Sequence, residues 1–200
     1  LSGFANAYVK PEGSAVAFDN AQETYTARYT NETVALAFAL TEEAMEDNLY
    51  DRLASRYTKA LARSMANAKQ IKSATPLNQG LPGIAAANAF QSGDNVNLFS
   101  TAHPTIAGTV SNTLATQADL NETSLEQSMI DIAGMTDERG LKIAARGMKM
   151  IVPSENQFNA ERLLKSQGRT GTADNDINAL KNMGMVPEGY RVNHYLTDVD

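Results

Sequence analysis

The sequence contains no cysteine, which excludes disulfide bonds, thiolate nucleophiles and zinc sites built on cysteine. Histidine occurs only twice, at His103 and His194. No run of eighteen or more apolar residues is present, so we predict no membrane span. No charged-then-apolar leader opens the chain, so we predict no signal peptide. The first residue is Leu1 rather than Met, and we expect the chain to be a fragment of a longer protein.

Basic residues are the minority among the charged ones. The chain has 17 Lys and Arg against 23 Asp and Glu, a net charge of -6. Surfaces that bind nucleic acid through phosphate contacts are normally basic, so we predict no specific grip on DNA. Hydrophobic residues make up 42% of the chain, enough for a sizeable core in one or two domains.

Glycine and proline are both absent from residues 41–74, where we predict one uninterrupted helix. Thr41 is a plausible N-cap, and we expect Pro76 to stop the helix. The acidic residues of its first turns oppose the helix dipole: Glu42, Glu43, Glu46 and Asp47. An apolar stripe follows at helical spacing: Met45, Leu49, Leu53, Tyr57, Leu61, Met65 and Ala68.

The length of this helix carries an argument about shape. About 33 residues at about 1.5 Å each span about 50 Å. A compact chain of this size would be about 43 Å across. We therefore expect a flat or elongated domain that leaves much surface to be covered by neighbouring copies.

Residues that favour β-structure precede the helix. They alternate with a period of two and predict strands at residues 14–18, 23–30 and 34–40. An isolated hairpin is marginal in water, so this arm needs a partner surface.

The second half of the chain predicts an α/β unit with short connections. A capping box at Thr123 and Glu126 predicts a helix to about Met135, and Ser154 with Gln157 predicts another to about Ser166. Further expected elements are a short helix at residues 84–90, a loop at 108–120, a strand at 148–152, a short helix at 177–183 and a strand at 190–196.

No residue pattern predicts a catalytic, cofactor or metal site. Ser100 lies near His103, but no nucleophile elbow accompanies it and spacing places no third, orienting carboxylate. The acidic first turns of the long helix are better explained by the helix dipole than by a cation site. The loop GRTGTADND, residues 168–176, lacks the Gly-Lys-Ser/Thr ending of a phosphate cradle.

Several stretches together resemble a known family. They are YTARYTNETVALAFALTEEAMEDN, NLFSTAHP, GMKMIVPSENQFNAERLLKS and GTADNDINALKNM. In order and spacing they resemble the major capsid protein family of tailed bacteriophages, including the Mu-like major head subunits. The resemblance covers nearly the whole chain.

The resemblance implies an α+β fold of the Hong Kong 97 type. Its parts would be an extended loop at residues 1–40 with a β-hairpin at about 14–40, a peripheral domain at 41–122 with the 41–74 spine helix, and a mixed α/β axial domain at 123–200. The closing strands of the axial and peripheral domains would follow Asp200, and the N-terminal arm would precede Leu1.

The function implied is structural rather than enzymatic. Copies would assemble into pentamers and hexamers of an icosahedral shell around double-stranded DNA, in the host cytoplasm, and would become part of the virion. Scaffolding, decoration and portal proteins are further partners implied, with no cofactor and no membrane. The alternative is a phage-encoded, protease-like enzyme or a binding domain on a long-helix scaffold.

Three consequences for variants follow. Removing the arm up to Leu40 should abolish assembly. Leu53→Asp should unfold the protein or block assembly, because it places a carboxylate in the apolar stripe. His103→Ala should be mild.

Overall fold

A computed structural model of the chain describes residues 2–47, 50–85, 89–169 and 176–197, without the side chains of residues 50–53. In chain order the elements are α1 (Glu42–Glu46), α2 (Tyr50–Gln79), β1 (His103–Thr105), β2 (Gly108–Val110), α3 (Glu122–Gly134), β3 (Met150–Val152), α4 (Gln157–Lys165), α5 (Ala179–Asn182) and β4 (Tyr190–Val192).

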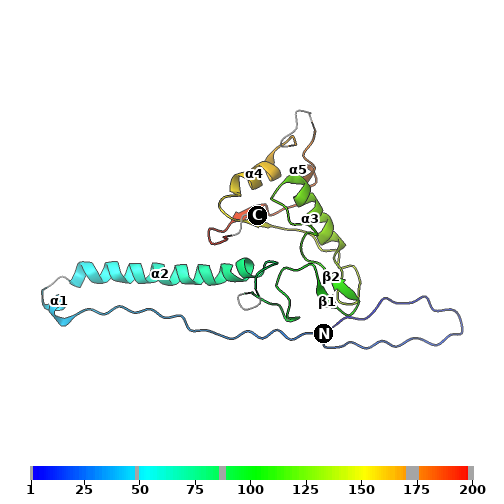
Figure 1. The fold of residues 1–200 in the computed structure, drawn as a ribbon, viewed down its shortest axis with the longest axis horizontal. Coiled ribbons are helices and arrows are strands. Elements are labelled where there is room, and N and C mark those ends of the chain that lie inside the picture. The colour runs from blue at the N-terminus through cyan, green and yellow to red at the C-terminus, as the bar shows by residue number, and fades with distance from the viewer. Residues whose placement is uncertain (1, 48–49, 86–88, 170–175, 198–200) are drawn as a thin grey trace.

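The molecule is a long bar with a folded body rising from one side (Figure 1). The bar consists of α2 and the extended N-terminal arm, residues 2–40, and the body holds α3, α4, α5 and the strands. The accessible surface is 14948 Å², whereas a compact monomer of 21.5 kDa exposes about 9,200 Å². The expected elongated shape is confirmed.

The single helix predicted at residues 41–74 is wrong in its bounds, because the structure has two helices there. α1 begins after Thr41, whose side-chain oxygen accepts from the Ala44 N–H at 3.4 Å, as a cap should. It ends after one turn, at Glu46, and α2 begins at Tyr50. Leu49 and the side chain of Leu53 lie outside the described part of the chain.

Pro76 does not stop the long helix, which continues to Gln79. A proline inside a helix removes one backbone hydrogen bond. Here tertiary hydrogen bonds hold the last turn in place. The carbonyls of Gln79 and Gly80 accept from the backbone N–H groups of Phe90 and Phe99, both at 2.8 Å. The expectation that proline ends a helix fails here because these tertiary hydrogen bonds hold the end of α2, and the sequence alone does not show them.

The strands predicted in the arm are absent from its described residues, which carry no ladder of backbone hydrogen bonds. The backbone is extended there (Figure 1), as the alternating pattern favours. Residues 2–22 turn back on themselves at Pro11–Ser14 and form a projecting loop on the side away from α2. Residues 24–40 run the other way, toward α1.

The body contains the predicted α/β unit. β3 and β4 pair in parallel, with Met150 opposite Tyr190 and Val152 opposite Val192, and α4 and α5 lie in the connection between them. Parallel strands need such a crossover. The most buried apolar side chains of the described residues are few: Ala74, Leu125, Val152, Ala160, Leu163, Leu180 and Val186.

Several local predictions need correction. The capping box of α3 is formed by Asn121 and Ser124, not by Thr123 and Glu126. The loop predicted at residues 108–120 includes β2, which pairs antiparallel with β1. The helix predicted at 84–90 is not found at residues 84–85 and 89–90, and residues 86–88 lie outside the described ones. No described helix is long and apolar enough to cross a membrane.

Leu163→Ala tests how much of the stability depends on this small core. Leu163 is 3% exposed on α4, so its truncation should lower the free energy of unfolding by about 2–5 kcal/mol. Phe158→Ala on the same helix is the matched control, because Phe158 is 67% exposed and should matter little in the isolated subunit. Equal losses in urea denaturation would show that the core lies elsewhere.

Candidate assembly surface

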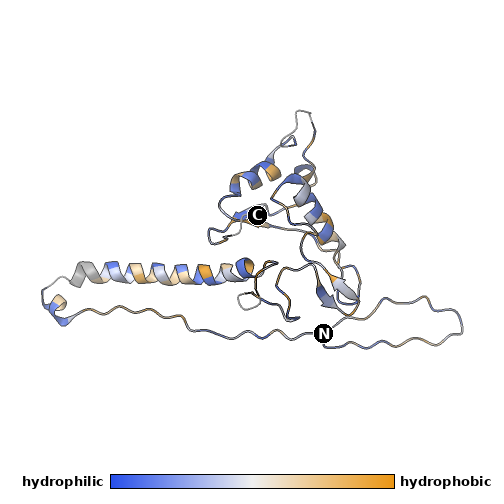
Figure 2. Ribbon diagram, in the orientation of Figure 1, coloured by the Kyte–Doolittle hydropathy of each residue, from blue (hydrophilic) through white to orange (hydrophobic). Residues whose placement is uncertain are grey.

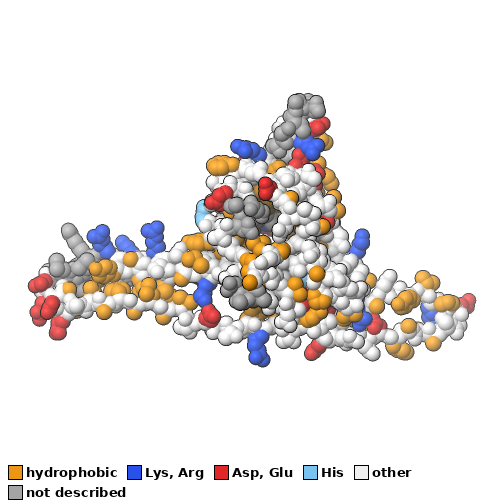
Figure 3. All heavy atoms as spheres, in the orientation of Figure 1, with side chains coloured by type: hydrophobic (Ala, Val, Ile, Leu, Met, Phe, Trp, Pro, Cys, Tyr) orange, Lys and Arg blue, Asp and Glu red, His pale blue; other side chains and the backbone are white. Residues whose placement is uncertain are grey.

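The arm covers one side of α2. The rings of Phe38 and Tyr57 lie 5.8 Å apart between centroids at 59°, and Lys72 forms an ion pair with Glu32. A shallow hollow between the two segments is lined by Glu32, Val34, Met65, Ala66, Lys69 and Lys72. In Figure 3 hydrophobic side chains gather between α2 and the arm. The arm therefore partly covers the predicted apolar stripe.

The Lys72–Glu32 ion pair adds little to this cover. The hydrogen bond and charge of Lys72 lower the pKa of the Glu32 carboxyl. Both side chains are mostly exposed, at 56% and 69%, so solvent screens the pair and it stabilises the arm little. The apolar side chains Val34, Leu36 and Phe38 remain 43–55% exposed. The cover is incomplete within one subunit.

The arm is anchored where it passes the body. The Thr24 hydroxyl donates to the carboxylate of Glu138 at 3.0 Å, and the Tyr25 hydroxyl donates to the Pro104 carbonyl at 2.9 Å. Close by, a Cβ added at Gly93 would lie 3.3 Å from the backbone nitrogen of Ala27. These contacts form a seat for the arm, made by the turn before β1, by β1 itself and by Glu138 after α3.

An Asp–His pair lies within this seat. The Nδ1 of His103 is 2.7 Å from Oδ2 of Asp94, and the two side chains are only 14% and 8% exposed. Burial raises the pKa of Asp94, but hydrogen bonds from Ser92, His103 and the Val96 N–H outweigh it, so the pKa is lowered overall. The pair ties β1 to the preceding turn, on which the arm rests.

This cluster does not have the order of a hydrolase triad. The Ser92 hydroxyl donates to Asp94, so the carboxylate lies between serine and histidine, whereas a triad places histidine between the other two. Ser100, the serine considered from sequence, accepts from the Ala102 N–H at 3.1 Å. Sequence reasoning missed Asp94, which reaches His103 only through the fold of the turn between them.

The other sequence candidates are spread over the molecule. His194 is exposed just after β4, and the acidic residues of α1 are exposed at the far end of the bar. Of the loop at 168–176, residues 170–175 lie outside the described ones. Among the described residues no three His, Asp or Glu side chains gather as a metal site requires. The expectation that no metal or catalytic site exists stays a prediction.

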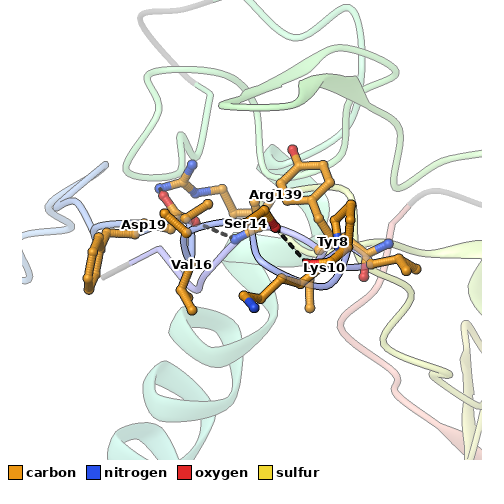
Figure 4. Close-up of a pocket in the computed structure, with 14 residues that line it drawn as sticks. Tyr8, Lys10, Ser14, Val16, Asp19 and Arg139 are labelled. Atoms are coloured by element: carbon orange, nitrogen blue, oxygen red, sulfur yellow. Dashed lines mark hydrogen bonds and ion pairs between the residues drawn. The ribbon is translucent and has the colours of Figure 1, made fainter.

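The projecting loop is closed at its base and open along its sides. The Ser2 N–H donates to the Gln22 carbonyl at 2.7 Å, and the Ala5 N–H donates to Asp19 Oδ2 at 2.7 Å. This bond from Ala5 is the main cause that lowers the pKa of Asp19, opposed by slight burial and aided by the Asn20 N–H and Arg139. In Figure 4 the side chains of Tyr8, Lys10 and Val16 stand out from the loop backbone.

Large apolar side chains of the loop and arm are more exposed than is usual in a compact monomeric protein. Val9 and Phe18 are each 96% exposed and Tyr8 is 83% exposed. The set also includes Phe4, Val16, Tyr25, Tyr29, Val34, Leu36 and Phe38. The surface exceeds that of a compact monomer by about 5,700 Å², and a standard interface takes about 800 Å² from each partner. This extra surface is large enough for interfaces with several neighbouring subunits.

These features leave a large apolar surface of the single chain uncovered. A family model described as phage capsid protein matches residues 24–199. The chain therefore belongs to the phage capsid protein family. Comparison with curated proteins and with solved structures found no match. Family membership gives the protein a structural role in the capsid, other capsid copies as partners, and a place in the virion.

The structure revises the expectation for His103→Ala, which sequence alone predicts to be mild. Removing the imidazole leaves the nearly buried Asp94 carboxylate without one of its partners, so the free energy of unfolding should fall by about 1–3 kcal/mol. His194→Ala is the control, since exposed positions usually stay within about 0.5 kcal/mol. Thermal unfolding of the two variants that gave equal midpoints would contradict this role.

Proposed function

We propose that the protein is the major shell subunit of a tailed phage, Mu-like, with a fold of the Hong Kong 97 type. Copies would form pentamers and hexamers that close an icosahedral head around double-stranded DNA. The observation that carries the proposal is the apolar loop and arm, which expose side chains such as Phe18 and Tyr29 far from the chain's own core. Closed head-to-tail contacts of this kind generate rings.

The proposed division of labour follows the shape of the molecule. Residues 1–40 would be the extended part, 41–122 the peripheral domain with α2 as spine, and 123–200 the axial domain that converges on symmetry axes. Within the extended part, we assign the main contact with a neighbour to residues 2–22, because α2 already covers residues 24–40 in part, although Tyr29 there is still exposed to a neighbour. This replaces the hairpin at about 14–40 that the family resemblance implied.

Other parts of the proposal rest on composition and on the family. The net charge of -6 fits a shell that encloses DNA without gripping it. Scaffolding, decoration and portal proteins are proposed as further partners, with assembly in the host cytoplasm. The proposed role requires no catalysis.

Shortening the projecting loop tests this function. Ala5 and Asp19 are hydrogen-bonded at the loop base, so residues 6–18 can be replaced by two glycines with little strain on the anchors. The variant should keep its far-ultraviolet circular dichroism and melting temperature but lose at least tenfold in particle yield, measured by sedimentation and negative-stain microscopy.

A matched control keeps the loop and its apolar side chains. Lys10→Ala with Glu12→Ala changes only exposed charges near the turn and should assemble normally. Normal shells from the shortened loop would contradict the proposed function, as would a wild-type protein that forms no large particle at any concentration.

A further inference from the structure

Charge is distributed very unevenly along the bar. In the sequence of α2, residues 50–79, six residues are Lys or Arg and Asp51 alone is acidic, although the whole chain carries -6. The segment just before it is the reverse. Glu42, Glu43, Glu46 and Asp47 are all exposed on α1 and its cap, with no basic residue among them. We call these four residues the acidic tip.

Three of the basic residues form a row on one face of α2. Arg56, Lys59 and Arg63 are exposed and follow one another at spacings of three and four, which places them on one side of a helix. The covered stripe at Leu61 and Met65 lies about 200° away at 100° per residue, so the row faces away from the arm. Figure 3 shows blue side chains along the edge of α2 opposite the arm. We call these three residues the basic row.

Neither the acidic tip nor the basic row is neutralised within the described part of one subunit. The ion pairs found there involve other residues. Both sets lie on the end of the bar that extends beyond the body, but on opposite sides of it (Figures 1 and 3). A neighbouring copy can therefore reach each of them without meeting the body of the first.

The basic row and the acidic tip are opposite in charge and similar in length. Seven residues of helix place Arg56 and Arg63 about 10 Å apart, and the five steps from Glu42 to Asp47 cover about 8 Å. We propose that the basic row on α2 is a docking surface for a second copy of this chain, which binds through its acidic tip. This deepens the proposed function and rests on it, because it names the surfaces that join neighbouring subunits.

DNA is the other polyanion that the basic row could face, and the observations favour it less. Proteins that bind DNA electrostatically commonly neutralise 6–10 phosphates, whereas the row offers three charges. The acidic tip lies at the same end of the bar, and it would repel a duplex laid along the row. A protein partner of limited size avoids that repulsion. Docking of unlike patches is also heterologous, as ring formation requires.

Charge reversal tests the pairing with full-length protein. Arg56→Glu, Lys59→Glu and Arg63→Glu together reverse the row, and Glu42→Lys, Glu43→Lys and Glu46→Lys together reverse the tip. Each triple variant alone should lose at least tenfold in particle yield, because its row and tip now carry like charge. The variant with all six changes should assemble again, because its row and tip once more carry opposite charge. Circular dichroism confirms that each remains helical.

The matched control adds charge to α2 away from the row. Thr58→Glu with Ser64→Glu introduces two carboxylates at exposed positions that are not three or four residues from any residue of the row, and should leave particle yield unchanged. Wild-type yield from both triple variants would overturn the inference, as would failure of the six-change variant to recover. If reversal of the row alone removed DNA from otherwise normal shells, the row would face DNA instead. Absence of particles from the wild-type chain would instead reject the proposed function itself.

Discussion

The arm of this protein has apolar side chains and no core of its own to bury them in. Residues 24–40 find partial cover against α2, through Phe38 on Tyr57 and the hollow beside Met65. The projecting loop finds none, and Phe18 stays 96% exposed. Burial of apolar surface is the main favourable term in folding and association. Under the proposed function, this chain would bury on assembly the apolar surface that other proteins bury when they fold.

The body likewise combines a small buried core with apolar side chains that stay exposed. Leu163, Leu180 and Val152 bury one small core around the β3–β4 pair, while Ile130 and Phe158 on its helices remain exposed. The core is enough to order the crossover but small for a chain of 200 residues. The anchors between arm and body are hydrogen bonds, such as Tyr25 to Pro104 and Thr24 to Glu138. Such hydrogen bonds fix the orientation of the arm relative to the body, and the largely buried Asp94–His103 pair holds the turn on which the arm rests.

Sequence reasoning identified elements whose signal is local. Periodicity and spacing predicted the stripe of α2, the helix after Leu120 and the α/β unit around Met150, whereas the parallel pairing of that unit comes from the structure. It failed where tertiary contacts decide: Pro76 stays helical because bonds from Phe90 and Phe99 hold the end of α2. Strand-like alternation in the arm gave an extended backbone without a ladder, since none of the described strands pairs with it. Asp94 was missed because its partner His103 is nine residues away.

The most direct test of the central claim is hydroxyl-radical footprinting of the dissociated subunit and of the assembled particle, read by mass spectrometry. Tyr8, Phe18 and Tyr29 are highly exposed in the single chain, at 83%, 96% and 84%. If neighbouring copies cover the loop and arm, oxidation of these three residues should fall several-fold on assembly, while the nearly buried Leu163 stays unreactive in both states. Equal oxidation of the three aromatic residues before and after assembly would contradict the account.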